Sequence, residues 1–278
     1  MKIVKPIFIL GHPRSGTSIL YKLFTRHKDT AFPEHFMDKY YLSEWKFGLI
    51  PLMVKQQEIR YHIRSNPHEG KFWQKFYSFG TYLDESDVND EVRKYIQKVI
   101  ETQLKSLHGK RFVNKQIDFC LRIRFLNKLF PDAFYINIYR EPKAVVSSLY
   151  RMMEKDWVNE SHDIYLHGYK GWDTIKECYG KDVSDFETCL NYYKFFINSL
   201  KKDIPIIREN TIDLKYEDFV QNPRTKLKEM LEFTGLKWYK ELENKIPEVL
   251  DLNNNEKWKT LPKDYQKILM EEFGTCDY

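Results

Sequence analysis

A glycine-bracketed loop between a short apolar run and a helical pattern is the feature that most constrains the fold. Residues 6–10 (PIFIL) are apolar, with β-branched and aromatic side chains that favour a buried strand. The loop at 11–18 (GHPRSGTS) contains two glycines, and residues 18–24 then follow helical spacing. Only 11 of the 278 residues are glycine, so two in one short loop indicate a tightly bent backbone. The sequence therefore predicts a strand, a loop and a helix in succession.

A second stretch repeats this order later in the chain. Residues 133–139 (AFYINIY) form another apolar run, the segment 140–142 (REP) interrupts it, and residues 144–150 follow helical spacing. Proline is favoured in the first turn of a helix, so Pro142 marks the helix start. Two such units predict a parallel sheet covered by helices. Further strands are expected at 111–114 and 211–216, and further helices at 92–107, 119–130, 186–202 and 224–234, with a final helix after Pro262.

The length of the chain and its aromatic residues indicate one domain with insertions. A chain of 278 residues allows one large or two small domains, and no repeat or low-complexity linker divides it. An aromatic-rich tract at 36–108 and a polar and aromatic tract at 156–185 interrupt the strand–helix pattern, and we interpret both as insertions that form an acceptor pocket. The expected fold is α/β: a single domain over residues 1–278, with a P-loop-like, three-layer arrangement in which helices flank a short central parallel sheet.

Composition excludes several classes of protein. Hydrophobic residues make up 42% of the chain, which excludes a wholly disordered protein. No apolar run approaches the roughly 18 residues of a membrane span, and the first residues lead straight into a predicted strand instead of a secretory signal, so we expect a cytoplasmic protein. A net charge of +5 suits an anionic ligand but is small for a nucleic-acid binder. The four cysteines lack metal-site spacing, so no metal site is expected, while a monomer and a homodimer both remain open.

The first loop has the properties of a phosphate-binding site. Its glycines let the backbone wrap around an anion, and the following helix presents free N–H groups and the positive end of its dipole. The spacing is that of GxxxxGK[ST], but Thr17 replaces the lysine that would reach the β- and γ-phosphates, and the nearby cation is Arg14. The second buried strand ends in Arg140, where a triphosphate enzyme would place a magnesium-binding aspartate. We therefore expect a phosphate-bearing ligand that needs no metal.

These residues resemble the sulfotransferases that use 3′-phosphoadenosine 5′-phosphosulfate (PAPS). Residues 13–18 (PRSGTS) match the loop that binds the 5′-phosphosulfate in that family. An arginine after a buried strand and a serine eight residues later hold the family's 3′-phosphate, and Arg140 and Ser148 stand at that separation. Residues 214–219 (LKYEDF) resemble a segment whose tyrosine lies near the adenine; an ordinary strand end with acidic residues that cap the next helix is the alternative. The closest likeness is to the bacterial and archaeal group that resembles tyrosylprotein sulfotransferases.

The resemblance implies a donor, a product and a set of binding residues. It covers residues 6–40, 110–150 and 211–235, and more weakly the tail, where Lys257-Trp258 resembles a late family segment whose basic residue reaches the 3′-phosphate. PAPS is then the donor and adenosine 3′,5′-bisphosphate the product. The implied cofactor-binding residues are Arg14, Ser15, Gly16, Thr17, Ser18, Arg140, Ser148, Tyr216 and Lys257.

Sulfuryl transfer also needs a base for the acceptor hydroxyl and cations for the charge that develops on the transferred group. Glu34 stands where tyrosylprotein sulfotransferases carry a catalytic glutamate, and His35 is the second candidate. A carboxylate base needs apolar surroundings, which the flanking Phe32, Phe36 and Met37 would supply. Arg14 and Lys115 are the candidate cations. Lys115 resembles the family's lysine beside the transferred group, although Ile117 replaces the proline that often follows it.

The resemblance implies an enzyme that transfers a sulfuryl group in line, without a metal, to a hydroxyl or amine. The acceptor is expected to be a small molecule, a lipid or a carbohydrate. Two alternatives remain open: a P-loop kinase or other phosphotransferase, and a family member that binds the nucleotide without catalysis.

Overall fold

The computed structural model describes residues 3–34, 49, 52, 67–78, 80–156, 185–250 and 255–274. Within these residues the strands form one five-stranded parallel sheet in the order β2-β3-β1-β4-β5. Every residue of β1 is buried, as expected for a central strand covered on both faces. The predicted parallel sheet is confirmed, and β2 is a short edge strand that the sequence did not reveal. The strands are β1 (Ile7–Leu10), β2 (Thr30–Ala31), β3 (Arg111–Lys115), β4 (Phe134–Tyr139) and β5 (Thr211–Lys215).

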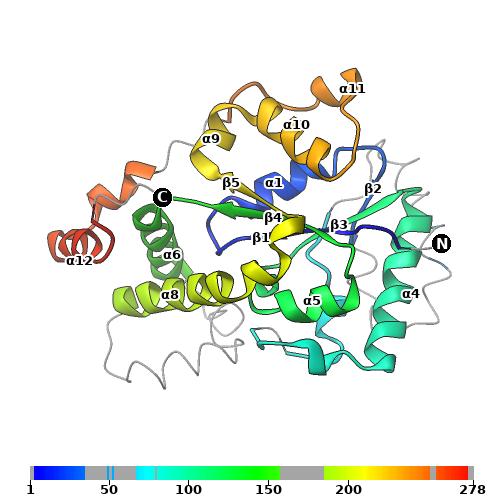
Figure 1. Ribbon diagram of the computed structural model, residues 1–278. Coiled ribbons are helices and arrows are strands. Elements are labelled where there is room, and N and C mark those ends of the chain that lie inside the picture. Colours follow the sequence, from blue (N-terminus) through cyan, green and yellow to red (C-terminus); the bar gives the residue numbers. More distant parts are fainter. Residues whose placement is uncertain are drawn as a thin grey trace.

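Helices cover both faces of the sheet. Figure 1 shows α1, α9, α10 and α11 on one face and α5 and α8 on the other, which gives the expected three layers. The predicted helix at 119–130 is divided: a 3-10 helix covers Ile117–Leu121, the backbone of Arg122 is not helical (φ −133°, ψ 20°), and α5 begins at Ile123. The helices are α1 (Thr17–Phe24), α4 (Asp90–Ser106), α5 (Ile123–Leu129), α6 (Pro142–Asp156), α8 (Asp185–Asp203), α9 (Tyr216–Gln221), α10 (Pro223–Phe233), α11 (Lys240–Glu243) and α12 (Lys263–Phe273).

Short 3-10 helices join several of these elements. They are Lys71–Gln74, Glu85–Asp87, Ile117–Leu121, Ile204–Asn210 and Asn255–Thr260.

The described part of the first insertion belongs to the core. Helix α4 packs against β2 and β3, and its apolar face, with Val92, Ile96 and Val99, is buried. Phe72 and Trp73 are buried as well, and the Trp73 ring lies edge-on to Phe8 of β1. Residues 157–184, which hold nearly all of the second predicted insertion, lie outside the described residues. Among the helices that the structure describes, none is long and apolar enough to cross a membrane.

Candidate functional site

The candidate functional residues follow the strands at one edge of the sheet. Because all five strands are parallel, their carboxyl ends lie at the same edge, where α/β proteins bind ligands. The glycine-bracketed loop follows β1, Glu34 follows β2, Lys115 ends β3, Arg140 follows β4 and Tyr216 follows β5. The order of the strands thus brings together residues that are far apart in the sequence.

The two loop glycines are required for different reasons. A Cβ at Gly11 would lie 2.5 Å from the main-chain oxygen of Ile138 on β4, so the loop could not approach the sheet. Gly16 precedes α1 with a φ of 94°, and a Cβ there would lie 2.5 Å from the ring of Tyr216. Arg14 also adopts a left-handed conformation, with a φ of 72°. This tight path leads the chain directly to the N-terminus of α1.

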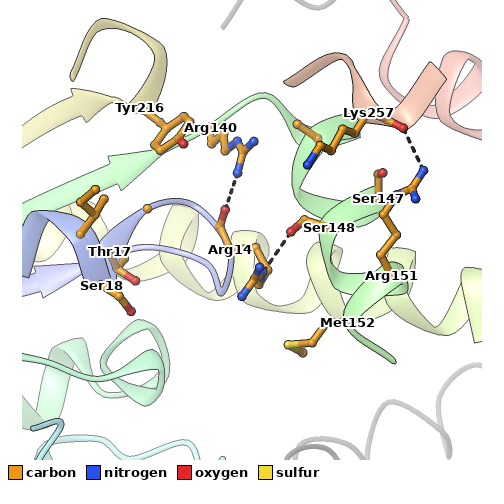
Figure 2. A pocket seen from close by; sticks show the side chains of 13 residues that line it. Arg14, Thr17, Ser18, Arg140, Ser147, Ser148, Arg151, Met152, Tyr216 and Lys257 are labelled. Carbon is orange, nitrogen blue, oxygen red and sulfur yellow. Dashed lines mark hydrogen bonds between the residues drawn. The ribbon is translucent and has the colours of Figure 1, made fainter. Parts of the chain in front are cut away.

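A cavity of about 480 Å³ lies beside this loop (Figure 2). It brings together nearly all of the residues expected to bind the cofactor. Ser15 does not line it: this serine is buried and, with His12, faces a separate cavity of about 130 Å³. The residues that line the larger cavity are Arg14, Gly16, Thr17, Ser18, Ile19, Arg140, Ala144, Ser147, Ser148, Arg151, Met152, Tyr216 and Lys257.

Arg140 is the most firmly held cation of this cavity. Its Nη1 donates a hydrogen bond to the main-chain oxygen of Arg14 at 3.0 Å, and its Cζ lies 4.4 Å from the centre of the Tyr216 ring. Its Nε donates to Asn255 Oδ1 at 2.8 Å. Burial lowers the pKa of Arg140 and raises that of Tyr216, but a guanidinium starts from so high a value that Arg140 keeps its charge. Arg140 therefore joins the first loop to the segment after β5.

Ser148 meets the first loop across the start of α6. Arg14 Nε donates a hydrogen bond to Ser148 Oγ at 3.0 Å, as Figure 2 shows. The eight-residue separation from Arg140 places Ser148 in the second turn of α6, on the side that faces the cavity. The structure therefore brings Arg14, Arg140 and Ser148 into one site.

Arg151 is a residue of the cavity that the sequence analysis missed. Its Nη2 donates to the main-chain oxygen of Lys257 at 3.2 Å, which connects α6 to the 3-10 helix at Asn255–Thr260. It lies three residues after Ser148 and so shares a helix face with that serine, a spacing that could have revealed it.

The cavity has the charge and the unused donors that an anion requires. Arg14, Arg140, Arg151 and Lys257 line it, whereas no acidic residue does among those described. Arg140 Nη2, Arg151 Nε and Ser147 Oγ are buried and have no hydrogen-bond partner in the described part of the chain. Buried donors without partners are costly, and phosphate oxygens would satisfy them. The residues present therefore fit an anionic ligand such as a phosphate ester.

The candidate base Glu34 and the candidate cation Lys115 do not line this cavity. Glu34 is fully buried and forms an antiparallel bridge with Pro67. Lys115 is buried at the end of β3, and its Nζ forms an ion pair with the carboxylate of Glu69. Because Pro67 and Glu69 are two residues apart, the same short segment reaches both Glu34 and Lys115. His35, the second candidate for the base, lies outside the described residues.

Side chains at the end of β3 hold the main chain of the segment that carries Glu69. Asn114 Nδ2 donates to the main-chain oxygen of Glu69 at 3.1 Å, and Gln116 Nε2 donates to that of Gly70 at 2.9 Å. Trp73 Nε1 donates to Asn114 Oδ1 at 2.7 Å. No sequence pattern indicated that Glu69 belongs to the site, since it becomes a neighbour of Lys115 only in the folded chain.

Curated proteins with known activities are similar to this chain. One is protein-tyrosine sulfotransferase 1 of Danio rerio, which is 21% identical over 235 residues, covering 84% of this chain and 53% of the relative. Another is the omega-hydroxy-beta-dihydromenaquinone-9 sulfotransferase Stf3 of Mycobacterium bovis, which is 23% identical over 261 residues, covering 83% of this chain and 63% of the relative. The chain thus spans about half the length of the tyrosine sulfotransferases that it matches.

Solved structures share the fold. Sulfotransferase STF9 from Mycobacterium avium superposes with a TM-score of 0.60 at 14% identity, covering 100% of this chain and 78% of the other. The sulfotransferase domain from the curacin biosynthetic pathway superposes with a TM-score of 0.55 at 17% identity, covering 98% of each chain. At these identities the likeness establishes the fold alone. The model of the sulfotransferase family matches residues 6–240, which include every strand described above, and the chain therefore belongs to the sulfotransferase family.

Proposed function

We propose that this protein transfers a sulfuryl group from PAPS to a hydroxyl or amine of its acceptor. The observation that carries the proposal is one cavity that joins the first loop to Arg140 and Ser148, with cations and unused donors around it. A ligand with phosphates at two ends would satisfy both parts of such a cavity. PAPS and its product adenosine 3′,5′-bisphosphate have that form.

The chain's residues divide between the two ends of the ligand. Four side chains that line the cavity around α6 are suited to the 3′-phosphate. They are Arg140, Ser148, Arg151 and Lys257. The main-chain N–H groups at Gly16, Thr17 and Ser18 and the Arg14 side chain are suited to the 5′-phosphosulfate at the N-terminus of α1. Tyr216, beside Gly16, is suited to the adenine, and Ser15 would support the loop from its buried side.

Catalysis is assigned to three side chains. When bound, PAPS would supply the activated sulfuryl group. Glu34 would take the proton of the acceptor hydroxyl, for which its complete burial is suited. Arg14 and Lys115 would place positive charge beside the transferred group, from the first loop and from the end of the adjacent strand β3.

The acceptor is proposed to be a small molecule, a lipid or a carbohydrate. The name of the Mycobacterium bovis relative describes a hydroxylated menaquinone, and the Danio rerio relative is named for protein tyrosine. Both names describe acceptors with a hydroxyl group.

Nucleotide binding tests the proposal directly. We expect isothermal titration to give tight binding of adenosine 3′,5′-bisphosphate and weak or no binding of ATP with magnesium. Arg140→Ala should raise the Kd of the bisphosphate by about 10–100-fold, because it removes charge-assisted hydrogen bonds. Preference for ATP with magnesium would indicate a phosphotransferase instead. Tight bisphosphate binding without labelled sulfuryl transfer into any acceptor, including those of a cell extract, would indicate a binding protein.

The Lys115–Glu69 pair gives a second prediction. Glu69→Gln removes a negative charge that competes with an anionic donor for Lys115, and the Glu69 side chain is 45% exposed. We expect the KM for PAPS to fall by about two- to fivefold at low salt, and the effect to shrink at high salt. The matched control is Glu229→Gln, which removes the partner of another lysine, Lys226, in an ion pair within α10. Equal changes of the KM for PAPS in Glu69→Gln and Glu229→Gln would show that the effect comes from the net charge of the protein and not from the Lys115–Glu69 pair.

A further inference from the structure

The amide of Asn255 connects Arg140 to the half-buried carboxylate of Glu217. Asn255 Oδ1 accepts a hydrogen bond from Arg140 Nε at 2.8 Å, and Asn255 Nδ2 donates to Glu217 Oε1. The same Glu217 oxygen accepts from the main-chain N–H of Glu141 at 3.2 Å, next to Arg140 in the chain. A guanidinium can only donate and a carboxylate can only accept, so the orientation of the amide follows from its partners.

These contacts leave the Arg140 side chain little freedom. Its Nε is held by Asn255, its Nη1 by the main-chain oxygen of Arg14, and its flat face by the ring of Tyr216. Its Nη2 is buried and has no hydrogen-bond partner among the described residues. A guanidinium that is already fixed loses less entropy when it binds a phosphate.

Asparagine also has the right charge for this position. Glu217 is close enough to offset the charge of Arg140, and the neutral amide of Asn255 stands between the two groups. An aspartate at 255 could still accept from Arg140, but it would add a negative charge beside the anion site and would face the carboxylate of Glu217 without a proton to donate. Asparagine fixes the guanidinium without reducing the positive charge available to the ligand.

The segment that carries Asn255 is itself anchored to α6. The main-chain oxygen of Lys257 accepts from Arg151, and Lys143 Nζ donates to the main-chain oxygen of Gly274 at 2.7 Å. Lys143 Nζ also lies 5.3 Å from the centre of the Trp258 ring. Asn255 is therefore held from the C-terminal side, while Arg140 extends from the end of β4.

We propose that Asn255 is a positioning residue that gives the site its selectivity for nucleotides with a 3′-phosphate. The proposal rests on the proposed function, in which Arg140 binds that phosphate. Asn255 acts through the guanidinium and is not expected to contact the reacting atoms. Its loss should therefore reduce affinity for ligands that have the 3′-phosphate and spare those that lack it.

The test compares adenosine 3′,5′-bisphosphate with adenosine 5′-monophosphate by isothermal titration to the full chain. For Asn255→Ala we expect the ratio of the two dissociation constants to move toward unity by about tenfold, with the monophosphate Kd nearly unchanged. Asn255→Asp should lower the preference for the bisphosphate over the monophosphate further, because it adds a negative charge beside the anion site. Asn244→Ala, which alters an exposed asparagine at the end of α11, should behave as wild type. Thermal unfolding of each variant shows whether it is folded.

The outcomes separate this proposal from the proposed function. If wild type prefers the bisphosphate and Asn255→Ala keeps the full preference, Asn255 has no positioning role. If Asn255→Ala lost the same affinity for both nucleotides, the role of Asn255 would be merely structural, and this result would also overturn the proposal. If wild type does not distinguish the two nucleotides, the proposed role of Arg140 fails, and the role of Asn255 fails with it.

Discussion

Replacing Glu34 with glutamine is expected to lower kcat by about 10²–10⁴-fold, the usual contribution of a general base. Glutamine keeps the size of the side chain but cannot take a proton. Glu34 is fully buried beyond the end of β2, and the bridge to Pro67 brings it to the segment that also holds Lys115. Turnover is measured as labelled sulfuryl transfer from PAPS into a cell extract that supplies the acceptor.

Nucleotide binding provides the control for this experiment. Glu34 does not line the cavity of about 480 Å³ beside the first loop, so the Kd of adenosine 3′,5′-bisphosphate should be the same in Glu34→Gln and wild type. A rise in that Kd together with a lower melting temperature would mean that Glu34 supports the fold instead of the reaction. Full turnover in Glu34→Gln, with loss of turnover in His35→Asn, would assign the base to His35.

His12 is expected to make stability strongly dependent on pH. It is buried against Tyr192, Tyr193 and Phe196 of α8, and burial lowers its pKa from the ordinary 6.5 to about 3. Its ring lies with Nδ1 2.6 Å from the main-chain oxygen of Pro13, which can only accept, so Nδ1 carries the proton of the neutral ring. The folded state thus disfavours the charged imidazolium form of His12, whereas the unfolded chain can protonate this side chain freely.

The sign of the effect follows from this difference in pKa. Because the pKa is lower in the folded state, the stabilisation is complete above about pH 6.5 and decreases as the pH falls toward 3, at about 1.4 kcal/mol per pH unit. Asp118 acts in the opposite direction, because burial raises its pKa to about 6 and favours its protonated form in the folded state. The wild-type profile between pH 4 and 6 therefore combines two opposing slopes.

A comparison with His12→Asn isolates the histidine. Asparagine can donate to the Pro13 oxygen but does not titrate, so the stability of wild type relative to this variant should fall by about 2.5 kcal/mol between pH 6 and pH 4. Urea unfolding at several pH values measures this difference. His108→Asn is the control, since His108 is exposed and its φ of 50° is a conformation that asparagine tolerates. Parallel profiles for wild type and His12→Asn would contradict the assignment.

Much of the fold could be predicted because its signals are local. The apolar run at 6–10, the glycines of the first loop and Pro142 each determine a strand, a turn or a helix start within a few residues. The strand at 211–216 was predicted with a small error: β5 ends at Lys215, and Tyr216 begins α9. The edge strand β2 is two residues long, too short for any periodicity to reveal it.

The sequence by itself therefore determined the α/β class and the glycine-bracketed loop, because these depend on short patterns along the chain. Its resemblance to the sulfotransferases added the expectation that Arg140 and Ser148 belong to one site. Only the tertiary structure decided which residues lie around them. Strand order placed Arg140 beside the Arg14 main chain, the C-terminal segment brought Asn255 to the same guanidinium, and the segment after Pro67 brought Glu69 to Lys115. Such contacts join residues that are distant in the sequence, and no local pattern encodes them, because they depend on how the separate elements pack.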